Sequence, residues 1–143
     1  MTPGGRILAI DPGKRRVGLA VSDELGITAQ GLDTFDRKSG DLFEHLSRLV
    51  VGYDVFEIVV GHPVSMSGRP NASSLDAEAL AEKIHLRLGV PVQLWDERLT
   101  TEEARRVLRG TRANKGVVDR TAAVFILQGY LDWLRRGSDG AGS

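Results

Sequence analysis

Residues 6–23 read RILAIDPGKRRVGLAVSD, and this stretch decides the fold. Residues 6–12 hold an apolar run that is typical of a buried strand, and residues 16–23 hold a second one. Residues 13–15, with a glycine at their start, are predicted to form a turn. A parallel crossover needs about a dozen residues or more, so this short connection can only join antiparallel strands. The chain therefore opens with a hairpin.

The rest of the chain alternates between strand and helix patterns. Hydrophobic periodicity and turn residues predict strands at 27–35, 55–60 and 90–95 and helices at 39–52, 74–88, 101–111 and 119–136. The two later strands are reached through helices and should lie parallel to the first. We predict an α/β fold with a mixed five-stranded sheet, antiparallel in its first three strands, forming one domain over residues 1–136 with a flexible tail at 137–143.

The last predicted helix carries apolar residues at helical spacing. They recur every three or four positions and predict one buried stripe, made of Ala122, Phe125, Ile126, Gly129, Tyr130 and Trp133.

Composition excludes several classes of protein. The 143 residues include no Cys, which rules out disulfides, thiolate zinc sites and a cysteine nucleophile. The 19 basic and 19 acidic residues balance, which argues against a general nucleic-acid coat. No stretch has the pattern of a signal peptide or the roughly 20 apolar residues of a membrane span. We expect a cytoplasmic protein without a membrane partner.

Positive charge is concentrated near the C-terminus. Seven basic residues and only three acids lie between positions 98 and 120. Arg105, Arg109 and Arg112 share one face of the predicted helix, at spacings i, i+4 and i+7. This face is either merely solvated or a track for a phosphate backbone.

Acids stand directly after two apolar strands. Asp11 follows the first strand, and Asp96 and Glu97 follow the last, on the same predicted edge of the sheet. Asp119 opens the last predicted helix. Each has a plain structural interpretation: an Asx turn for Asp11, a surface loop paired with Arg98 for Asp96 and Glu97, and a helix N-cap for Asp119. If they converge instead, they form an oxygen-ligand site for Mg²⁺ or Mn²⁺.

Four ordered blocks resemble one known family. Residues 10–23 (IDPGKRRVGLAVSD), 60–63 (VGHP), 96–101 (DERLTT) and 119–128 (DRTAAVFILQ) closely resemble the YqgF/RuvX family. Its members are described as nucleases of pre-16S rRNA or as Holliday-junction-resolvase-like proteins. The resemblance covers nearly the whole chain and implies an RNase H-like fold, in agreement with the sheet predicted above.

The resemblance also implies site residues. The family's acids fall on Asp11, Glu97 and Asp119, with Asp96 as a further candidate metal ligand. Related RuvC-type resolvases carry an acid near the end of the fourth strand, where residues 61–65 have none, and Glu97 is the candidate substitute. The family commonly has an apolar residue where this chain has His62. This histidine is either an inert loop residue or a group that helps to protonate the leaving oxygen.

These groups permit phosphodiester hydrolysis with two Mg²⁺ or Mn²⁺ ions. Asp11 would bridge the ions, and Glu97 and Asp119 would each complete one coordination sphere. Phosphates flanking the scissile one would be held by basic residues, namely Lys14, Arg15, Arg98, Arg105, Arg109 and Arg112. The expected substrate is a precursor of 16S rRNA or branched DNA, and a resolvase acting on branched DNA would need to be a homodimer.

Two other classes of function share these features. Actin-like phosphotransferases and ATPases also open with an Asp-x-Gly hairpin, but they need a second domain to close over the nucleotide. A non-catalytic nucleic-acid-binding protein could keep the same fold. A metal titration followed by heating separates the classes, because only a metal site should be stabilised by Mn²⁺ alone.

Overall fold

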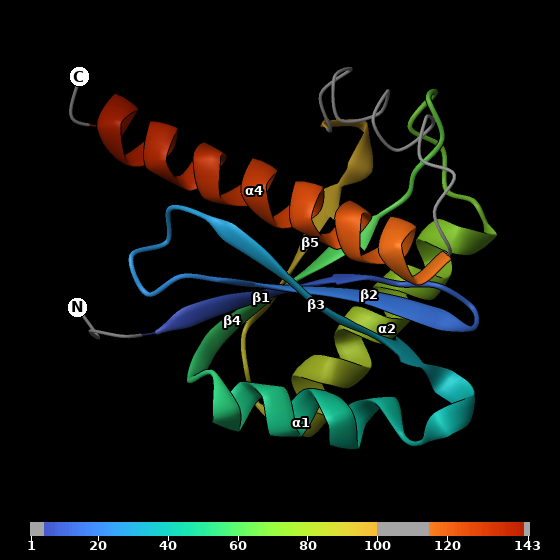
Figure 1. The fold of residues 1–143 in the computed structure, drawn as a ribbon. Helices are drawn as coiled ribbons and strands as arrows, with labels where there is room; N and C mark the ends of the chain where they lie inside the picture. The colour runs from blue at the N-terminus through green and yellow to red at the C-terminus, as the bar shows by residue number, and fades with distance from the viewer. Residues whose placement is uncertain (1–4, 100–114, 142–143) are drawn as a thin grey trace.

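The computed structural model describes residues 5–99 and 115–141, and its centre is one five-stranded sheet (Figure 1). The strands are β1 (Arg6–Asp11), β2 (Arg16–Ser22), β3 (Ala29–Asp36), β4 (Val55–His62) and β5 (Val92–Asp96), and they pair in the order β3-β2-β1-β4-β5. β2 is antiparallel to both β1 and β3, whereas β4 is parallel to β1 and β5. The predicted mixed sheet is confirmed.

Helices cover both faces of the sheet. Figure 1 shows α1 (Leu42–Gly52) and α2 (Ala72–Leu88) on one face and α4 (Lys115–Ala141) across the other. Two short 3-10 turns, η1 (Arg37–Ser39) and η2 (Glu97–Leu99), follow β3 and β5. The predicted helix at 101–111 lies outside the described residues. In the described part of the chain, no helix combines the length and apolarity needed to cross a membrane.

The core is divided by the sheet because strand side chains alternate between its faces. In β1, Leu8 and Ile10 pack with α1 and α2, whereas Ile7 and Ala9 pack with α4. All four side chains are buried. This two-sided burial explains why β1 is a continuous apolar run, and it fixes the strand ends at which the polar residues emerge.

The buried face of α4 differs from the predicted one. Its buried residues are Ala123, Ile126, Leu127, Tyr130 and Leu131, while Trp133 is 52% exposed. The predicted stripe was therefore partly wrong. Neighbouring residues on a helix are only about 100° apart, so two overlapping apolar stripes fit the same sequence until a sheet selects one. The helix also begins at Lys115 and runs to Ala141, past both predicted ends and into the segment predicted as a tail.

Candidate active site

The carboxyl ends of β1, β4 and β5 lie side by side at one edge of the sheet. Ile10 pairs with Val60, and Val60 pairs with Leu94, so the next residues of all three strands reach this edge together. Asp11 ends β1, and Glu97 begins η2 directly after β5. Edges of this kind collect the ligands of α/β sheets. The two acids that the sequence placed at separate strand ends thus belong to one site.

Asp11 and Glu97 are joined by a hydrogen bond between their side chains. An ionised carboxylate only accepts hydrogen bonds, so this bond requires a proton on one of the two side chains. Burial raises the pKa of Glu97 above its ordinary value of 4.5, and the charge of Asp96 acts in the same direction. The hydrogen bond with Asp11 and the nearby His62 oppose this rise. Ionisation of Glu97 in the folded protein is therefore less favourable than in water.

Gly61 makes room for this pair. A Cβ atom on Gly61 would lie 2.6 Å from Oε1 of Glu97 and 2.7 Å from Cδ1 of Ile126 on α4. A Cβ atom essentially never comes this close to another heavy atom, so any side chain at position 61 would displace its neighbours. The glycine at the end of β4 thus lets the Glu97 carboxyl cross over β4 toward Asp11.

We expect Gly61→Ala to lower any cleavage activity of this site about a hundredfold, because a catalytic group moved by about 1 Å can cost that much. Stability should fall by only about 1 kcal/mol, since the atoms in the way are the ends of flexible side chains. Gly52→Ala is the matched control, because a Cβ there meets nothing within 4 Å. Cleavage rates and thermal melts of both variants test this. Normal cleavage by Gly61→Ala would show that the position of Glu97 does not matter.

Asp96 is engaged elsewhere. Its carboxylate accepts bonds from Nη2 and Nε of Arg98 at 2.6 and 3.0 Å, and from the Arg98 backbone N–H at 2.9 Å. Charge-assisted bonds of this kind are strong, and they lower the pKa of Asp96. The sequence offered this salt bridge with Arg98 as the structural alternative to a metal-binding role for Asp96. Two of the predicted residues, one a metal ligand and one a phosphate ligand, therefore neutralise each other in this structure.

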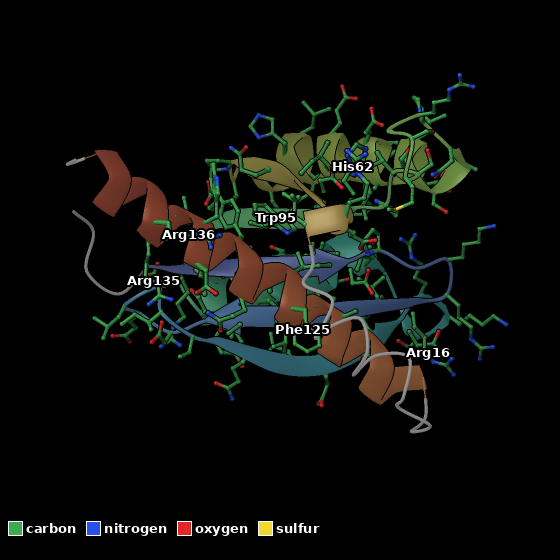
Figure 2. The ribbon with its side chains drawn as sticks, turned by 90° about the horizontal axis from the view of Figure 1, so that it is seen from above. Arg16, His62, Trp95, Phe125, Arg135 and Arg136 are labelled. Carbon is green, nitrogen blue, oxygen red and sulfur yellow. The ribbon has the colours of Figure 1, made fainter. Side chains whose placement is uncertain are left out.

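His62 lies between the acids and α2. Its Nε2 is 3.1 Å from Oε2 of Glu78, and Figure 2 shows it on the side of the sheet toward that helix. His62 also lowers the pKa of both Asp96 and Glu97, which places its ring beside the acids. The side chain is 21% exposed. A role in protonation stays a prediction, and the location is compatible with it.

The remaining predicted residues are placed only in part. Lys14 and Arg15 are exposed in the turn directly after Asp11, and Nε of Arg15 lies 3.8 Å from Oδ2 of Asp36. Asp119 belongs to the backbone of α4, but its side chain lies outside the described residues. Since α4 begins at Lys115, Asp119 is not the helix N-cap, which corrects that alternative. Outside the described residues lie three further candidates, Arg105, Arg109 and Arg112.

α4 nevertheless relates position 119 to the acid pair. Ile126 faces Gly61 and Glu97. Position 119 precedes Ile126 by two helical turns, about 10.5 Å along the axis, and so lies on the same side of the helix. Figure 1 shows the N-terminal end of α4 on the side of the β1–β2 turn. The backbone of position 119 therefore lies toward the edge of the sheet at which Asp11 and Glu97 are found.

Two contributors to the site were missed from the sequence. Gly61 lies in β4 directly before its last residue, and a glycine inside a strand is a known sign of close backbone approach. Glu78 belongs to an exposed helical surface and gives no signal in the sequence. It approaches His62 only because α2 packs against the end of β4.

The raised pKa of Glu97 has a consequence for stability. As pH rises above about 4.5, the unfolded chain loses this proton while the folded protein retains it, so the free energy of unfolding falls. Glu97→Gln removes this fall. We therefore compare the melting temperatures of Glu97→Gln and the wild type in EDTA. The melting temperature of the variant minus that of the wild type should increase between about pH 4 and about pH 7. A constant difference across this range would contradict the raised pKa.

The chemistry of the pair fits a divalent cation. Two neighbouring carboxyl groups can give up a proton to bind Mg²⁺ or Mn²⁺, ions that prefer carboxylates and keep water or phosphate oxygens in the remaining positions. Among the residues with described side chains, no group of three or more potential ligands could hold a metal. The pair alone is therefore not a complete metal site.

Known proteins match both the sequence and the fold. The sequence model of the family RuvX, described as "Holliday junction resolvase", matches residues 5–133. A protein of Koribacter versatilis is 48% identical over 141 residues, covering 94% of this chain and 90% of its own length. One of Dictyoglomus thermophilum is 46% identical over 132 residues, covering 89% and 95%. Both are named "Putative pre-16S rRNA nuclease".

Solved structures match the fold at low identity. The T. thermophilus RuvC in complex with a Holliday junction substrate is 16% identical, with a TM-score of 0.63, and the match covers 94% of this chain and 97% of that one. A second structure of Thermus thermophilus RuvC gives a TM-score of 0.58 at 15% identity, covering 90% and 96%. These matches confirm the RNase H-like architecture that the strand order indicates.

Proposed function

The chain belongs to the RuvX family, and on this premise we propose that it is a metal-dependent nuclease. Its reaction would be hydrolysis of phosphodiester bonds in structured nucleic acid, with 5′-end processing of 16S rRNA precursors in the cytoplasm as its first role. The hydrogen-bonded pair of Asp11 and Glu97 carries this proposal, because it joins two oxygen ligands at the ligand-binding edge of the sheet. The names of the relatives support the choice of substrate.

The acids would hold one or two divalent cations. Asp11, at the end of a rigid central strand, would provide the shared ligand, and Glu97 and Asp119 would complete the coordination. When bound, Mg²⁺ or Mn²⁺ supplies Lewis-acid activation of water and neutralises charge on the phosphate. Any proton held by Asp11 or Glu97 would be released as the cation binds. Asp96 would then act through Arg98, which it holds beside the site by bonds of 2.6 to 3.0 Å.

Basic residues next to the acids would position the substrate. Lys14 and Arg15 follow Asp11 in an exposed turn, so their charges can reach phosphates that flank the scissile one. Such contacts fix the position and orientation of the nucleic acid and do not select its sequence. The arginines at 105, 109 and 112 are proposed to extend the same phosphate track.

Metal removal tests this proposal. We expect cleavage of a 5′-extended 16S rRNA fragment with Mn²⁺ or Mg²⁺ and none in excess EDTA, because the acid pair without a cation repels the phosphate. Asp11→Asn, purified in parallel, reports any contaminating nuclease. Mn²⁺ should also raise the melting temperature of the wild type without nucleic acid. Full cleavage in EDTA would overturn the metal mechanism, and binding of RNA without any cleavage would favour a non-catalytic role.

Branched DNA is the second candidate substrate. The family description names a Holliday junction resolvase, which favours this alternative. A resolvase must cut two strands of one junction symmetrically and hence act as a homodimer. Mass measurement in solution, with a cleavage assay on a four-way junction, decides between the substrates: a dimer that makes paired nicks supports resolution, and a monomer that trims rRNA ends supports processing.

A further inference from the structure

A cavity of about 460 Å³ opens beside the β1–β2 turn, on the sheet face covered by α1 and α2. Its walls come from four parts of the chain: the turn after Asp11, η1, α1 and α2. We call it the α2 cavity. The residues that matter to its chemistry are Gly13, Lys14, Arg37, Phe43, Asp76 and Lys83.

The α2 cavity is positively charged. Lys14, Arg37 and Lys83 line it together with a single acid, Asp76. All three cationic side chains are exposed. Within residues 5–99 and 115–141, none of the three forms an ion pair. Cations from three separate elements that face one hollow without partners are suited to an anion, because their mutual repulsion is relieved when it binds.

The cationic rim is held in place by its own hydrogen bonds. The backbone N–H of Arg37 donates to the carbonyl oxygen of Arg15 at 2.8 Å, which ties η1 to the β1–β2 turn. Asp36 caps η1 by accepting from the N–H of Lys38 at 2.9 Å. At Gly13 a Cβ atom would lie 2.1 Å from the carbonyl oxygen of Arg16, so only glycine allows this tight turn. Lys14 and Arg37 are thus carried on fixed backbone.

The position of the α2 cavity relates it to the acid pair. Pro12 and Gly13 line the cavity and directly follow Asp11 in the chain. The C-terminal end of β3, which leads into Arg37, lies at the same end of the sheet as the C-terminal end of β1, because both strands are antiparallel to β2. A strand of nucleic acid whose scissile phosphate lies at Asp11 would therefore pass next to this rim.

We propose that the α2 cavity binds a non-scissile phosphate of the substrate strand, close to the scissile one, through Lys14, Arg37 and Lys83. This inference rests on the proposed nuclease function. It adds the path of the bound nucleic-acid strand, which runs from the acid pair toward α2. Asp76 also lines the cavity and repels an anion, so the phosphate is expected to bind nearer the three cations than Asp76. Phe43, which is half-buried, also lines the cavity, and the Arg87 guanidinium lies over its ring at 4.3 Å from the ring centroid.

Salt-dependent binding tests the proposal. Affinity for a labelled oligonucleotide is measured in EDTA, where no cleavage occurs, for wild type, Arg37→Ala, Lys83→Ala and the double variant. Each lost phosphate contact should flatten the slope of log affinity against log salt by about 0.7 to 0.9. Lys38→Ala is the matched control, because Lys38 is an exposed cation of η1 that does not line the cavity. Unchanged slopes in folded cavity variants would overturn the proposal.

Neutral linkages identify the source of the phosphate. Single methylphosphonates are placed in turn beside the scissile position of the oligonucleotide. One of them should weaken binding by the wild type and weaken binding by the Arg37→Ala/Lys83→Ala double variant less, because that variant has already lost two of the three cations that hold the phosphate. Inorganic phosphate serves as the second probe: a melting-temperature rise with it in the wild type alone, without sensitivity to any linkage, would show a free-anion site and overturn strand binding. These binding results do not depend on cleavage, so failure of the nuclease proposal would be seen separately.

Discussion

Asp11→Asn is expected to lower the cleavage rate at least about a thousandfold while nucleic-acid affinity changes less than about twofold. The loss is large because Asp11 is the shared ligand in the proposed site, and stabilisation by a metal is worth several kcal/mol, at 1.36 kcal/mol for each factor of ten. Affinity is preserved because the phosphate contacts come from Lys14, Arg15 and other basic residues. Single-turnover cleavage and binding in EDTA measure the two effects.

The same variant gives a second readout through Glu97. An Asn amide can donate a hydrogen bond to the Glu97 carboxylate without competing for a proton, so it removes one source of repulsion. Asp11→Asn should therefore keep or raise the melting temperature in EDTA and lose the rise produced by Mn²⁺. Cleavage at the normal rate, or a Mn²⁺ response equal to that of the wild type, would mean that Asp11 is not a ligand.

The fold was predictable because its signals are local. Short connections force the first three strands into an antiparallel arrangement, and apolar runs such as Ile7 to Ile10 mark buried strands. The phase of α4 was not predictable in the same way. Ile126 belongs to two apolar stripes that overlap on the helix, and only packing against Ala9 and Val59 in the sheet selects the stripe that also holds Ala123 and Leu127.

The candidate site was predictable where it depends on strand ends. Asp11 and Glu97 follow apolar runs on parallel strands, so topology alone places them at one edge. The difference between Glu97 and its neighbour Asp96 was not predictable, because it depends on side-chain direction: Glu97 turns over Gly61 toward Asp11, while Asp96 binds Arg98. The α2 cavity was also invisible in the sequence, since Arg37 and Lys83 belong to separate exposed surfaces.

Asp119 provides the second large effect. If its carboxylate completes the metal site, both Asp119→Asn and Asp119→Ala should lose cleavage by about a thousandfold. Neither should destabilise the protein in EDTA. Position 119 is the fifth residue of α4, so no cap is lost, and Ala is a better helix former than Asp by about 0.5 kcal/mol. Removing one of three neighbouring carboxylates also relieves repulsion.

Loss of cleavage without loss of stability separates a metal ligand from a structural residue. If Asp119 were structural, its variants would be less stable and would cleave at the normal rate. Asp132→Ala is the control within the same helix: it removes an acid that accepts from Gln128 at 3.1 Å and pairs with Arg135, remote from the acid pair in sequence and in contacts. It should cleave normally. Thermal melts with and without Mn²⁺, beside a cleavage assay on the three variants, decide the matter. Asp119 variants that melt higher in EDTA, ignore Mn²⁺ and fail to cut identify a ligand, whereas variants that cut normally exclude Asp119 from the site.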